Sequence, residues 1–541
     1  MAMPQSSPPE SSKEGSWLGP FQSPAFSMLW SAMLTASIGV RMQQVGAAWL
    51  MTGLNPDPVS VALVQAATAL PIFLFALPAG AMASAINRRF VLIGVQAFAV
   101  FLVFVFSVMV TLGRATPGWL LGFVFLAGTA AVLVTPAWYA IMPQLVPRGN
   151  EQPAITLNSM GFNIAGVFGP ALAGLAMAAL GRPAPFWIAL LCASSLIAAV
   201  VYWQPPQESA RRLPLDRFAA ALRASFRHAR RNPFLAVTLA HALVFVVSAS
   251  AYWALLPLVV RNAIGGGPAL YGLLLGAIGA GAVAGAMLLG HMLRRLGVDR
   301  LASGCSIGSA LALVFFGLAR EPYTAIAASL IAGFAWMGMM AICNASAHIS
   351  LPVWVRGRGL SLVAVVMSGG LVLGSLLWGQ VATLASVPVA LLLAAAVTFF
   401  GMLLMWRLRF HPGTSLDLLP SIHWPEPIVT RDLETDRGPV MITVEYRVPP
   451  ENRDVFLAAV FRLAEARRRD GAFDWGLYED ATRDGRFVET FLVDSWMEHL
   501  RQHERVANTD RLLQDAINRY QIGGVPRITR IVAVEPDAAR G

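Results

Sequence analysis

Between Phe26 and Phe410 the chain has twelve long apolar segments, and none of them contains an aspartate or a glutamate. Only six acidic residues occur in this stretch, and each lies in a gap between segments: Asp57, Glu151, Glu208, Asp216, Asp299 and Glu321. A carboxylate at the centre of a bilayer costs about 3 kcal/mol or more without a partner. The exclusion of acids therefore indicates a chain that spans a membrane.

Each segment is long enough to cross a hydrocarbon core about 30 Å thick. Because backbone polar groups in lipid must be satisfied within the segment, we predict helices. The predicted spans cover residues 26–51, 59–83, 90–112, 118–142, 154–180, 184–203, 233–260, 268–293, 301–319, 322–350, 359–382 and 386–409. The fold class is thus an all-α membrane protein, followed by a small α+β domain.

Six predicted regions follow from changes in composition along the chain. They are a disordered leader (1–20), a six-helix bundle (21–203), a cytoplasmic connection (204–232), a second six-helix bundle (233–410), a linker (411–438) and a soluble domain (439–541). The connection contains an Arg-rich amphipathic stretch (215–231). Two interpretations of that stretch stand: a helix along the membrane surface and a solvated helix joining two bundles.

The placement of arginine predicts the orientation. Gaps on one side of the membrane hold fifteen arginines, whereas the opposite gaps hold four: Arg114, Arg182, Arg261 and Arg320. The arginine-rich side is expected to be cytoplasmic, which places both termini in the cytoplasm and the protein in the inner membrane. The chain has a net charge of +10, and residues 26–410 alone carry +16 from 22 arginines and six acids, so we expect the bilayer and not nucleic acid as partner.

The two apolar halves carry related elements at corresponding positions. The fifth segment contains Gly169, Pro170 and Gly174, and the eleventh contains Gly374, Ser375 and Gly379. The runs just before them, AIMPQLVPRG (140–149) and HISLPVWVRG (348–357), also match in character. Two six-helix pseudo-repeats of this kind are how many transporters build a substrate path at the membrane midplane. Close packing of helices through small residues is the simpler explanation for any single glycine.

The last hundred residues alternate strand and helix patterns. We predict strands at 441–448, 473–478, 486–496 and 528–534, with helices at 452–469 and 498–520. The order βαββαβ is the ferredoxin-like arrangement. Such domains are often dimeric through the sheet, so a homodimer through this cytoplasmic domain is a further expectation.

Several stretches resemble the major facilitator superfamily, in particular its drug- and siderophore-exporter branch of the transmembrane secretion effector type. They are GAAWLMTGL (46–54), VALVQAATALPIFLFALPAGAMA (61–83), LNSMGFNIAGVFGPALAG (157–174), WALLPLVVR (253–261) and GSLLWG (374–379). The resemblance covers residues 20–410. It implies transport by alternating access, without identifying the substrate.

The resemblance gives the loop after the second span a gating role. Gly80, Arg88 and Arg89 match the pattern of the superfamily, but Ser84 stands where an aspartate is expected. That aspartate normally makes charge contacts that hold one conformation closed, so its loss leaves the gating role open. A purely topological role for the two arginines is the alternative.

The Gly-Pro element of the fifth span resembles the antiporter motif of exporters. Gly169, Pro170 and Gly174 match, with Ala173 in place of a second glycine. Proline removes a backbone hydrogen bond and bends the helix. In exporters the element is thought to bias the direction of transport, while a kink that serves only packing is the alternative.

The soluble domain resembles small domains of the antibiotic-biosynthesis monooxygenase type, most clearly in SWMEHLRQHERV (495–506). Trp475, Trp496, His499 and His503 either line a pocket or are ordinary buried and partly exposed residues. We find no nucleophile–base signature and no cofactor motif in the chain, so we expect no enzyme activity, no cofactor and no metal.

Few polar residues lie inside the spans, and they are the candidates for the transport cavity: Arg41, Gln44, Gln65, Asn163, His241 and Asn344. Arg41 is in the middle of the first span, where a guanidinium must face a cavity or acceptors. His241 can titrate near neutral pH and is the candidate carrier of a coupling proton. A hydrogen-bonded core histidine is the alternative.

Together these features predict a secondary transporter that exports a small lipophilic molecule, neutral or anionic, across the inner membrane. An importer or facilitator is one alternative. An exporter whose soluble domain binds or modifies the substrate is another, and a sensor without transport is a third.

Overall fold

The computed structural model describes residues 19–85, 88–147, 149–203, 232–351, 353–410, 438–469, 471–496, 499, 508–522, 524 and 526–533. The chain forms two compact units. The first comprises Met1–Pro214, Ala242–Ala341 and Ala364–Arg407, and the second Leu215–His241, Ile342–Val363 and Leu408–Gly541. The predicted leader, connection and linker fall almost wholly outside the described residues, so the domain boundaries remain predictions.

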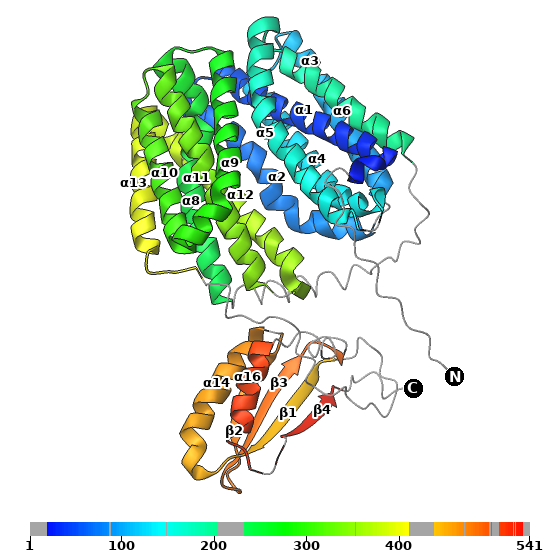
Figure 1. The fold of residues 1–541 in the computed structure, drawn as a ribbon, viewed down its shortest axis with the longest axis vertical. Coiled ribbons are helices and arrows are strands. Elements are labelled where there is room, and N and C mark those ends of the chain that lie inside the picture. The colour runs from blue at the N-terminus through cyan, green and yellow to red at the C-terminus, as the bar shows by residue number, and fades with distance from the viewer. Residues whose placement is uncertain are drawn as a thin grey trace, which may run out of the picture. The chain divides into compact units, whose positions relative to one another are not determined.

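Twelve helices of 19 or more residues lie in the described part between residues 24 and 405 (Figure 1). The first six are α1 (Pro24–Leu54), α2 (Pro58–Ala85), α3 (Arg88–Thr111), α4 (Pro117–Ile141), α5 (Glu151–Leu180) and α6 (Ala184–Tyr202). The others are α8 (Pro233–Leu258), α9 (Pro268–Leu296), α10 (Val298–Leu318), α11 (Pro322–Ser350), α12 (Val353–Leu384) and α13 (Val387–Met405). Short turns add η1 (Gly19–Gln22), η2 (Met142–Leu145) and a π-helical turn, η3 (Val259–Ile264).

Local sequence explains where these helices begin and end. α1, α4 and α13 each have a Ser or Thr N-cap whose hydroxyl accepts a backbone N–H, followed by proline in the first turn. Proline suits that position because its missing N–H would have no intrahelical partner there. α9 ends at Gly297, with a φ of 75°, a conformation that glycine adopts without strain.

Eleven of the twelve helices are long and apolar enough to cross a membrane by length and composition. The protein is therefore a multi-pass membrane protein. The helix outside this set is α1, which carries Arg41, Gln43 and Gln44 in its middle. No acid occurs inside the eleven, apart from Glu151 and Asp299 in the first turns of α5 and α10.

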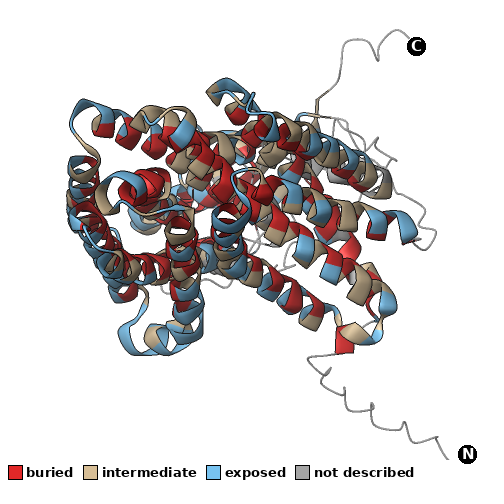
Figure 2. Ribbon diagram, turned by 90° about the horizontal axis from the view of Figure 1, so that it is seen from above, coloured by how far each residue is buried: buried red, intermediate tan, exposed pale blue. Residues whose placement is uncertain are grey.

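In the first unit, α1 packs against α5 and α6, α2 against α4, and α10 against α13. α5 also packs against α9, so a helix from the first six meets one from the second six. Buried residues lie on helix faces that meet other helices, and exposed ones on faces turned away (Figure 2). Many exposed residues are large and apolar, such as Phe101 on α3 and Phe400 on α13, as expected for helices surrounded by lipid.

In the second unit, residues 438–533, which we call the soluble part after the sequence prediction, contain a four-stranded antiparallel sheet in the order β2-β3-β1-β4. The strands are β1 (Val440–Arg447), β2 (Phe473–Glu479), β3 (Arg486–Val493) and β4 (Arg527–Val532); the helices are α14 (Arg453–Arg469) and α16 (Asn508–Asn518). The described elements follow the predicted order. Central β1 pairs with β3 through Val440↔Val493 to Arg447↔Arg486.

The core of this sheet follows the period of two along its strands. Val440, Ile442, Val444 and Tyr446 of β1 are buried, while the residues between them are partly accessible. Phe456 of α14 packs on this buried face. The sheet and its helices thus enclose a hydrophobic core of their own.

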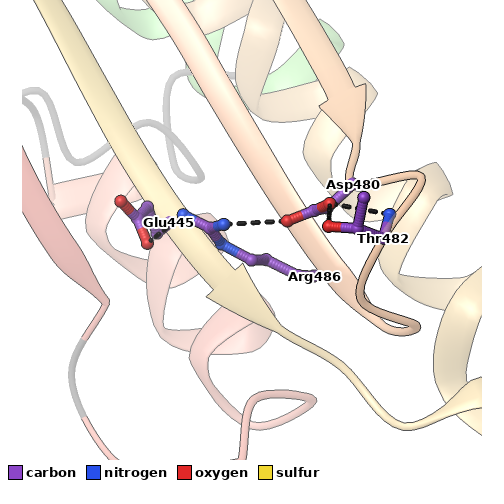
Figure 3. A network of polar contacts seen from close by, with 4 residues as sticks. All are labelled: Glu445, Asp480, Thr482 and Arg486. Carbon is purple, nitrogen blue, oxygen red and sulfur yellow. Dashed lines mark hydrogen bonds and ion pairs between the residues drawn. The ribbon is translucent and has the colours of Figure 1, made fainter.

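The turn between β2 and β3 is held by charged side chains (Figure 3). Arg486 donates to Asp480 at 2.8 Å and to Glu445 of β1 at 2.9 Å. The side chain and backbone N–H of Thr482, together with Arg486, donate to Asp480 and lower its pKa to about 2. The cluster therefore ties the turn to the neighbouring strand.

Candidate functional site

Arg41 projects from the middle of α1, where it is exposed despite its central position along the helix. Its Nη1 donates to Gln44 Oε1 at 3.2 Å, one turn further along. The structure thus brings together two of the six predicted cavity residues. A guanidinium within a membrane needs water or acceptors, and Gln44 supplies one acceptor.

The stem of Arg41 lies directly on the Gly-Pro element of α5. A Cβ placed on Gly169 would be 2.6 Å from the Arg41 Cβ and 3.3 Å from the carbonyl oxygen of Ile38. Real Cβ atoms do not approach so closely, so only glycine fits here. The cavity arginine and the antiporter-like element, which the sequence presents as separate signals, are one packed unit.

The counterpart on α12 makes the equivalent contact in the second half of the bundle. A Cβ on Gly374 would be 2.5 Å from the carbonyl oxygen of Val247 on α8, and it would also meet the Ser250 hydroxyl. Gly169 therefore packs on α1, the first helix of the first half, and Gly374 packs on α8, the first helix of the second half. In this correspondence Ser250, which is fully buried, takes the place of Arg41.

The second glycine of each element contacts the opposite half. A Cβ on Gly174 of α5 would be 2.9 Å from Gly272 Cα on α9. A Cβ on Gly379 of α12 would be 2.7 Å from Ala62 Cβ on α2. The absence of side chains lets these helices approach each other at the backbone.

Polar contacts join the first half (α1–α6) to the second half (α8–α13) at one end of the bundle, which we call the distal end. It carries the turns that follow α1, α5, α8 and α12. Arg261 of η3 donates to the Thr52 hydroxyl at the end of α1, at 3.0 Å. Thr383 of α12 donates to Asp57, before α2, at 3.0 Å.

An aromatic stack adds to this distal closure. Trp49 of α1 and Tyr271 of α9 have ring centroids 5.7 Å apart and nearly parallel planes. We name the closed boundary formed by Trp49, Thr52, Asp57 and their partners the distal seam. All these described contacts between the halves gather at that end.

The remaining predicted cavity residues of the first unit are not joined to Arg41. Asn163 is exposed on α5 and donates to the Ser159 carbonyl of its own helix at 3.1 Å. Gln65 is half-buried on α2.

His241 and Asn344 belong to the second unit. The His241 Nδ1 lies 3.0 Å from the carbonyl oxygen of Val237, and its ring centroid is 4.3 Å from that of Phe410. Because a carbonyl only accepts, this contact requires a proton on Nδ1. Asn344 is exposed on α11.

The loop predicted to act in gating is described only in part. Arg89 donates to the carbonyl oxygen of Val201 at 2.8 Å, in the last turn of α6. A cation at this position is favourable because helix C-termini carry unpaired carbonyls and partial negative charge. The side chains of Ser84 and Arg88 are not among the described ones, so the role of these residues and of Gly80 stays a prediction.

In the soluble part of the second unit, a carboxylate is buried in the core. Glu489 of β3 is fully buried and accepts from Tyr446 at 2.8 Å and from Trp475 at 2.9 Å. The Arg467 Nε lies 3.5 Å from the same carboxylate, and its Nη2 donates to Gln514 at 2.9 Å. Burial, together with the Glu489 charge, holds the pKa of Tyr446 well above its ordinary value, so the phenol remains a donor.

Two of the residues that resemblance placed around a pocket are core residues. Trp496 is 7% exposed, and His499 is fully buried with its Nε2 2.9 Å from the Arg530 Nε. Trp475 is bound to Glu489, and His503 lies outside the described residues. Among the described residues, no group of three or more His, Cys, Asp or Glu is placed to hold a metal ion.

Sequence reasoning missed the distal seam. No motif marks its members, and the two polar links join positions that are more than 200 residues apart. The one available signal is that only four arginines lie on that side of the membrane, and two of these, Arg182 and Arg261, lie at the seam.

Solved structures share this helix arrangement. A nucleoside transporter, NupG, matches with a TM-score of 0.52 and 13% identity, over 71% of this chain and 99% of that one. A bacterial homologue of the human lysosomal transporter Spinster, inward-facing and unoccupied, matches at 0.51 and 15%, over 72% and 99%. An auto-inhibited POT family peptide transporter matches at 0.56 and 12%, over 71% and 97%. The chain thus shares the helix arrangement of these three proteins.

The family follows from the sequence itself. Residues 15–537 match the transmembrane secretion effector family, and the chain belongs to it. The Staphyloferrin A transporter of Staphylococcus aureus (strain NCTC 8325 / PS 47) is 22% identical over 268 residues, which is 48% of this chain. That match spans 66% of the relative, just under two thirds of its length. The protein is accordingly a transporter and not an enzyme.

Proposed function

We propose that this transporter exports a small lipophilic molecule, neutral or anionic, across the inner membrane by alternating access. The observation that carries the proposal is the contact between Arg41 and Gly169. It places the single arginine in the interior of a span against the element that resembles an exporter motif. A charged group of the substrate bound by Arg41 would therefore lie next to α5, the helix that moves in this proposal.

Alternating access requires two bundles that rock against each other. The paired glycines on α5 and α12 support this, because each first glycine packs within its half and each second glycine packs on the other half. We regard the two halves as pseudo-repeats, with α1 as the twelfth span. The seam then represents one end of the transport path in its closed state.

The arginine asymmetry supports an external distal end and cytoplasmic termini. In that orientation the seam closes the path on the outside, so a substrate enters from the cytoplasm. Export also agrees with the family description of secretion. Import remains the alternative, and it would run the same cycle with the opposite loading side.

The electrostatics of the spans support a substrate that is not cationic. Arg41 is exposed, and the eleven apolar helices have no carboxylate beyond the first turns of α5 and α10. A cationic molecule would meet like charge without a compensating acid. A lipophilic anion would meet a guanidinium, a strong donor for carboxylates and phosphates.

We further propose that the soluble part is a ferredoxin-like domain that pairs two copies of the chain. The βαββαβ order and the antiparallel sheet support this assignment. The buried Glu489 cluster stabilises its core, and we assign it no catalytic role. Mixing differently tagged full-length chains and testing for co-purification measures the pairing.

Uptake into proteoliposomes that hold the purified chain in the inside-out orientation tests the main proposal. We expect uptake of anionic and neutral lipophilic dyes to exceed that of cationic ones. Arg41→Gln should reduce anion uptake at least tenfold and neutral uptake by less, with Arg41→Lys intermediate. Arg114→Gln, in the turn after α3, is the matched control. Preferential transport of cations, or equal loss of all dyes in Arg41→Gln, contradicts the proposal.

His241 is tested in the same vesicles with an imposed pH gradient. If it carries the coupling proton, His241→Ala removes the dependence of uptake on the gradient and leaves passive exchange. Undiminished, gradient-dependent uptake by the variant eliminates this role.

A further inference from the structure

Two arginines from opposite halves of the bundle converge on one glycine at the distal seam. Gly53 is the penultimate residue of α1, and a Cβ placed there would lie 3.6 Å from the Arg261 Nη1 and 3.7 Å from the Arg182 Cζ. The two guanidinium groups are therefore no further apart than the sum of these distances. Arg182 comes from the turn between α5 and α6, and Arg261 comes from η3.

Neither arginine forms an ion pair with a described carboxylate. Arg261 donates to the neutral Thr52 hydroxyl, and Arg182 makes no hydrogen bond or ion pair with any described residue. Both side chains are exposed. Two like charges at this separation repel each other, and an anion between them would remove the repulsion.

The acid nearest in sequence is already engaged elsewhere. Asp57 accepts from the backbone N–H and hydroxyl of Ser60 through Oδ2, and from Thr383 through Oδ1. Both of its oxygens therefore serve the start of α2 and the end of α12. The chain supplies no carboxylate of its own to the two arginines in the part that the structure describes.

The backbone around the pair suits an anion. Gly53 has no side chain, so no Cβ occupies the position that is 3.6–3.7 Å from both guanidinium groups. Arg182 also directly precedes Pro183, the N-cap of α6, and a helix N-terminus favours negative charge. Guanidinium forks bind oxyanions through two parallel hydrogen bonds.

We propose that Arg182 and Arg261, which both approach Gly53, form a binding site for a small oxyanion of the phosphate, sulfate or carboxylate class, with Thr52 holding the Arg261 side chain in place. Because Arg182 and Arg261 belong to different halves, the bound anion holds the distal seam closed. Binding at this site does not depend on the direction or substrate of transport. A free oxyanion and the phosphate of a lipid headgroup share the required chemistry.

Thermal unfolding of the full-length, detergent-purified chain tests the site, with sodium sulfate compared with sodium chloride at equal ionic strength. We expect sulfate to stabilise the protein saturably, and Arg182→Gln and Arg261→Gln each to weaken its apparent affinity at least fivefold. Arg182→Lys, which keeps the charge without the fork, should weaken it less. Arg114→Gln, an exposed arginine of another distal turn, should leave it unchanged.

A disulfide cross-link reports whether the anion closes the seam. Asp57→Cys and Thr383→Cys, in a chain whose Cys192, Cys305 and Cys343 are replaced by serine, should cross-link faster in sulfate. The increase should vanish when Arg182→Gln is added. Cross-linking independent of sulfate contradicts the bridging role, even if the anion binds.

A final arm separates the two sources of oxyanion. Native mass spectrometry with added phosphatidylglycerol, with or without inorganic phosphate, should show lipid adducts lost in Arg182→Gln if the headgroup is the ligand. If the lipid adducts are equally abundant in the wild type and in Arg182→Gln, and phosphate still stabilises the protein, the ligand is the free ion. Equal stabilisation by sulfate and chloride in the wild type, or equal sulfate affinity in wild type, Arg182→Gln and Arg261→Gln, overturns the proposal.

Discussion

The membrane helices and the soluble part treat the carboxylate in opposite ways. The spans exclude it, and their polar needs are met by amides, hydroxyls and Arg41. The soluble core instead buries Glu489 completely and surrounds it with Tyr446, Trp475 and Arg467. Both regions have an apolar interior, so hydrophobicity alone does not explain the difference.

The difference lies in what can be placed around the charge. A compact sheet-and-helix core brings donors from β1, β2 and α14 to one carboxylate, which replaces the lost water. Helices in lipid contact each other along narrow seams, where glycine contacts leave no room for such a shell. A buried charge is therefore acceptable where several elements converge, and it is avoided where only two helices meet.

The largest expected effect comes from removing the buried acid of the soluble part. Glu489→Ala leaves Arg467 buried without its anion, and such a break costs about 3–5 kcal/mol. Hydrogen exchange of the β1 and β3 amides in the full-length chain, read by mass spectrometry, should rise accordingly. Glu479→Gln, which breaks a half-exposed pair with Arg453, is the control and should change exchange little. Similar exchange in both variants would show that Glu489 does not support the core.

The reverse experiment adds a carboxylate at an exposed position of a membrane helix and at one of the soluble part. Phe101, in the middle of α3, and Phe461, in the middle of α14, are 64% and 55% exposed. Phe101→Asp should cost about 3 kcal/mol of insertion free energy. Phe461→Asp, in water, should cost far less. The yield of inserted and folded protein measures both, and equal yields would mean that Phe101 does not face lipid.

A smaller effect is expected from filling a glycine contact between the halves. Gly174→Val pushes α5 from α9, and overpacking of this kind costs about 1–3 kcal/mol. Transport should fall at least fivefold, together with cross-linking between residues 57 and 383. Gly166→Val on the same helix has no atom within 4 Å of the added Cβ and should retain transport. Loss of transport in both variants would indicate a general requirement for small residues on α5.

The smallest effect concerns the turn between β2 and β3. The pKa of Asp480 is about 2 in the folded chain and about 4 in unfolded chains. The stabilisation of the folded state by ionised Asp480 is therefore complete above about pH 4. It is lost as the pH falls from about 4 to about 2. Hydrogen exchange of residues 480–486 should rise over this range, and Asp480→Asn should remove that step. A step that persists in Asp480→Asn belongs to another acid.

Much of the fold follows from patterns that report on single segments. Acid-free apolar runs locate the spans, and alternation along 440–447 and 486–493 locates the central strands. These patterns arise because each helix or strand meets one kind of environment along each face. Helix α1 is recognisable in the sequence although Arg41, Gln43 and Gln44 lie in its middle.

The candidate site is predictable only in part. Arg41 and the glycines of α5 and α12 are unusual residues for their positions, so the sequence singles them out. Their contact, the correspondence of Arg41 with Ser250 and the distal seam depend on how helices pack. Packing is decided by shape over distant positions, and single-residue types do not record it.

The strength of the seam has a consequence for turnover. Its two polar links, Arg261 to Thr52 and Thr383 to Asp57, each contribute about 1 kcal/mol net. Together they bias the equilibrium between closed and open states by roughly thirtyfold. A ligand that prefers the open state by little more than this ratio can reverse the populations. In the proposed alternating-access cycle, such a seam is mostly closed without ligand, and ligand binding alone supplies the free energy of opening.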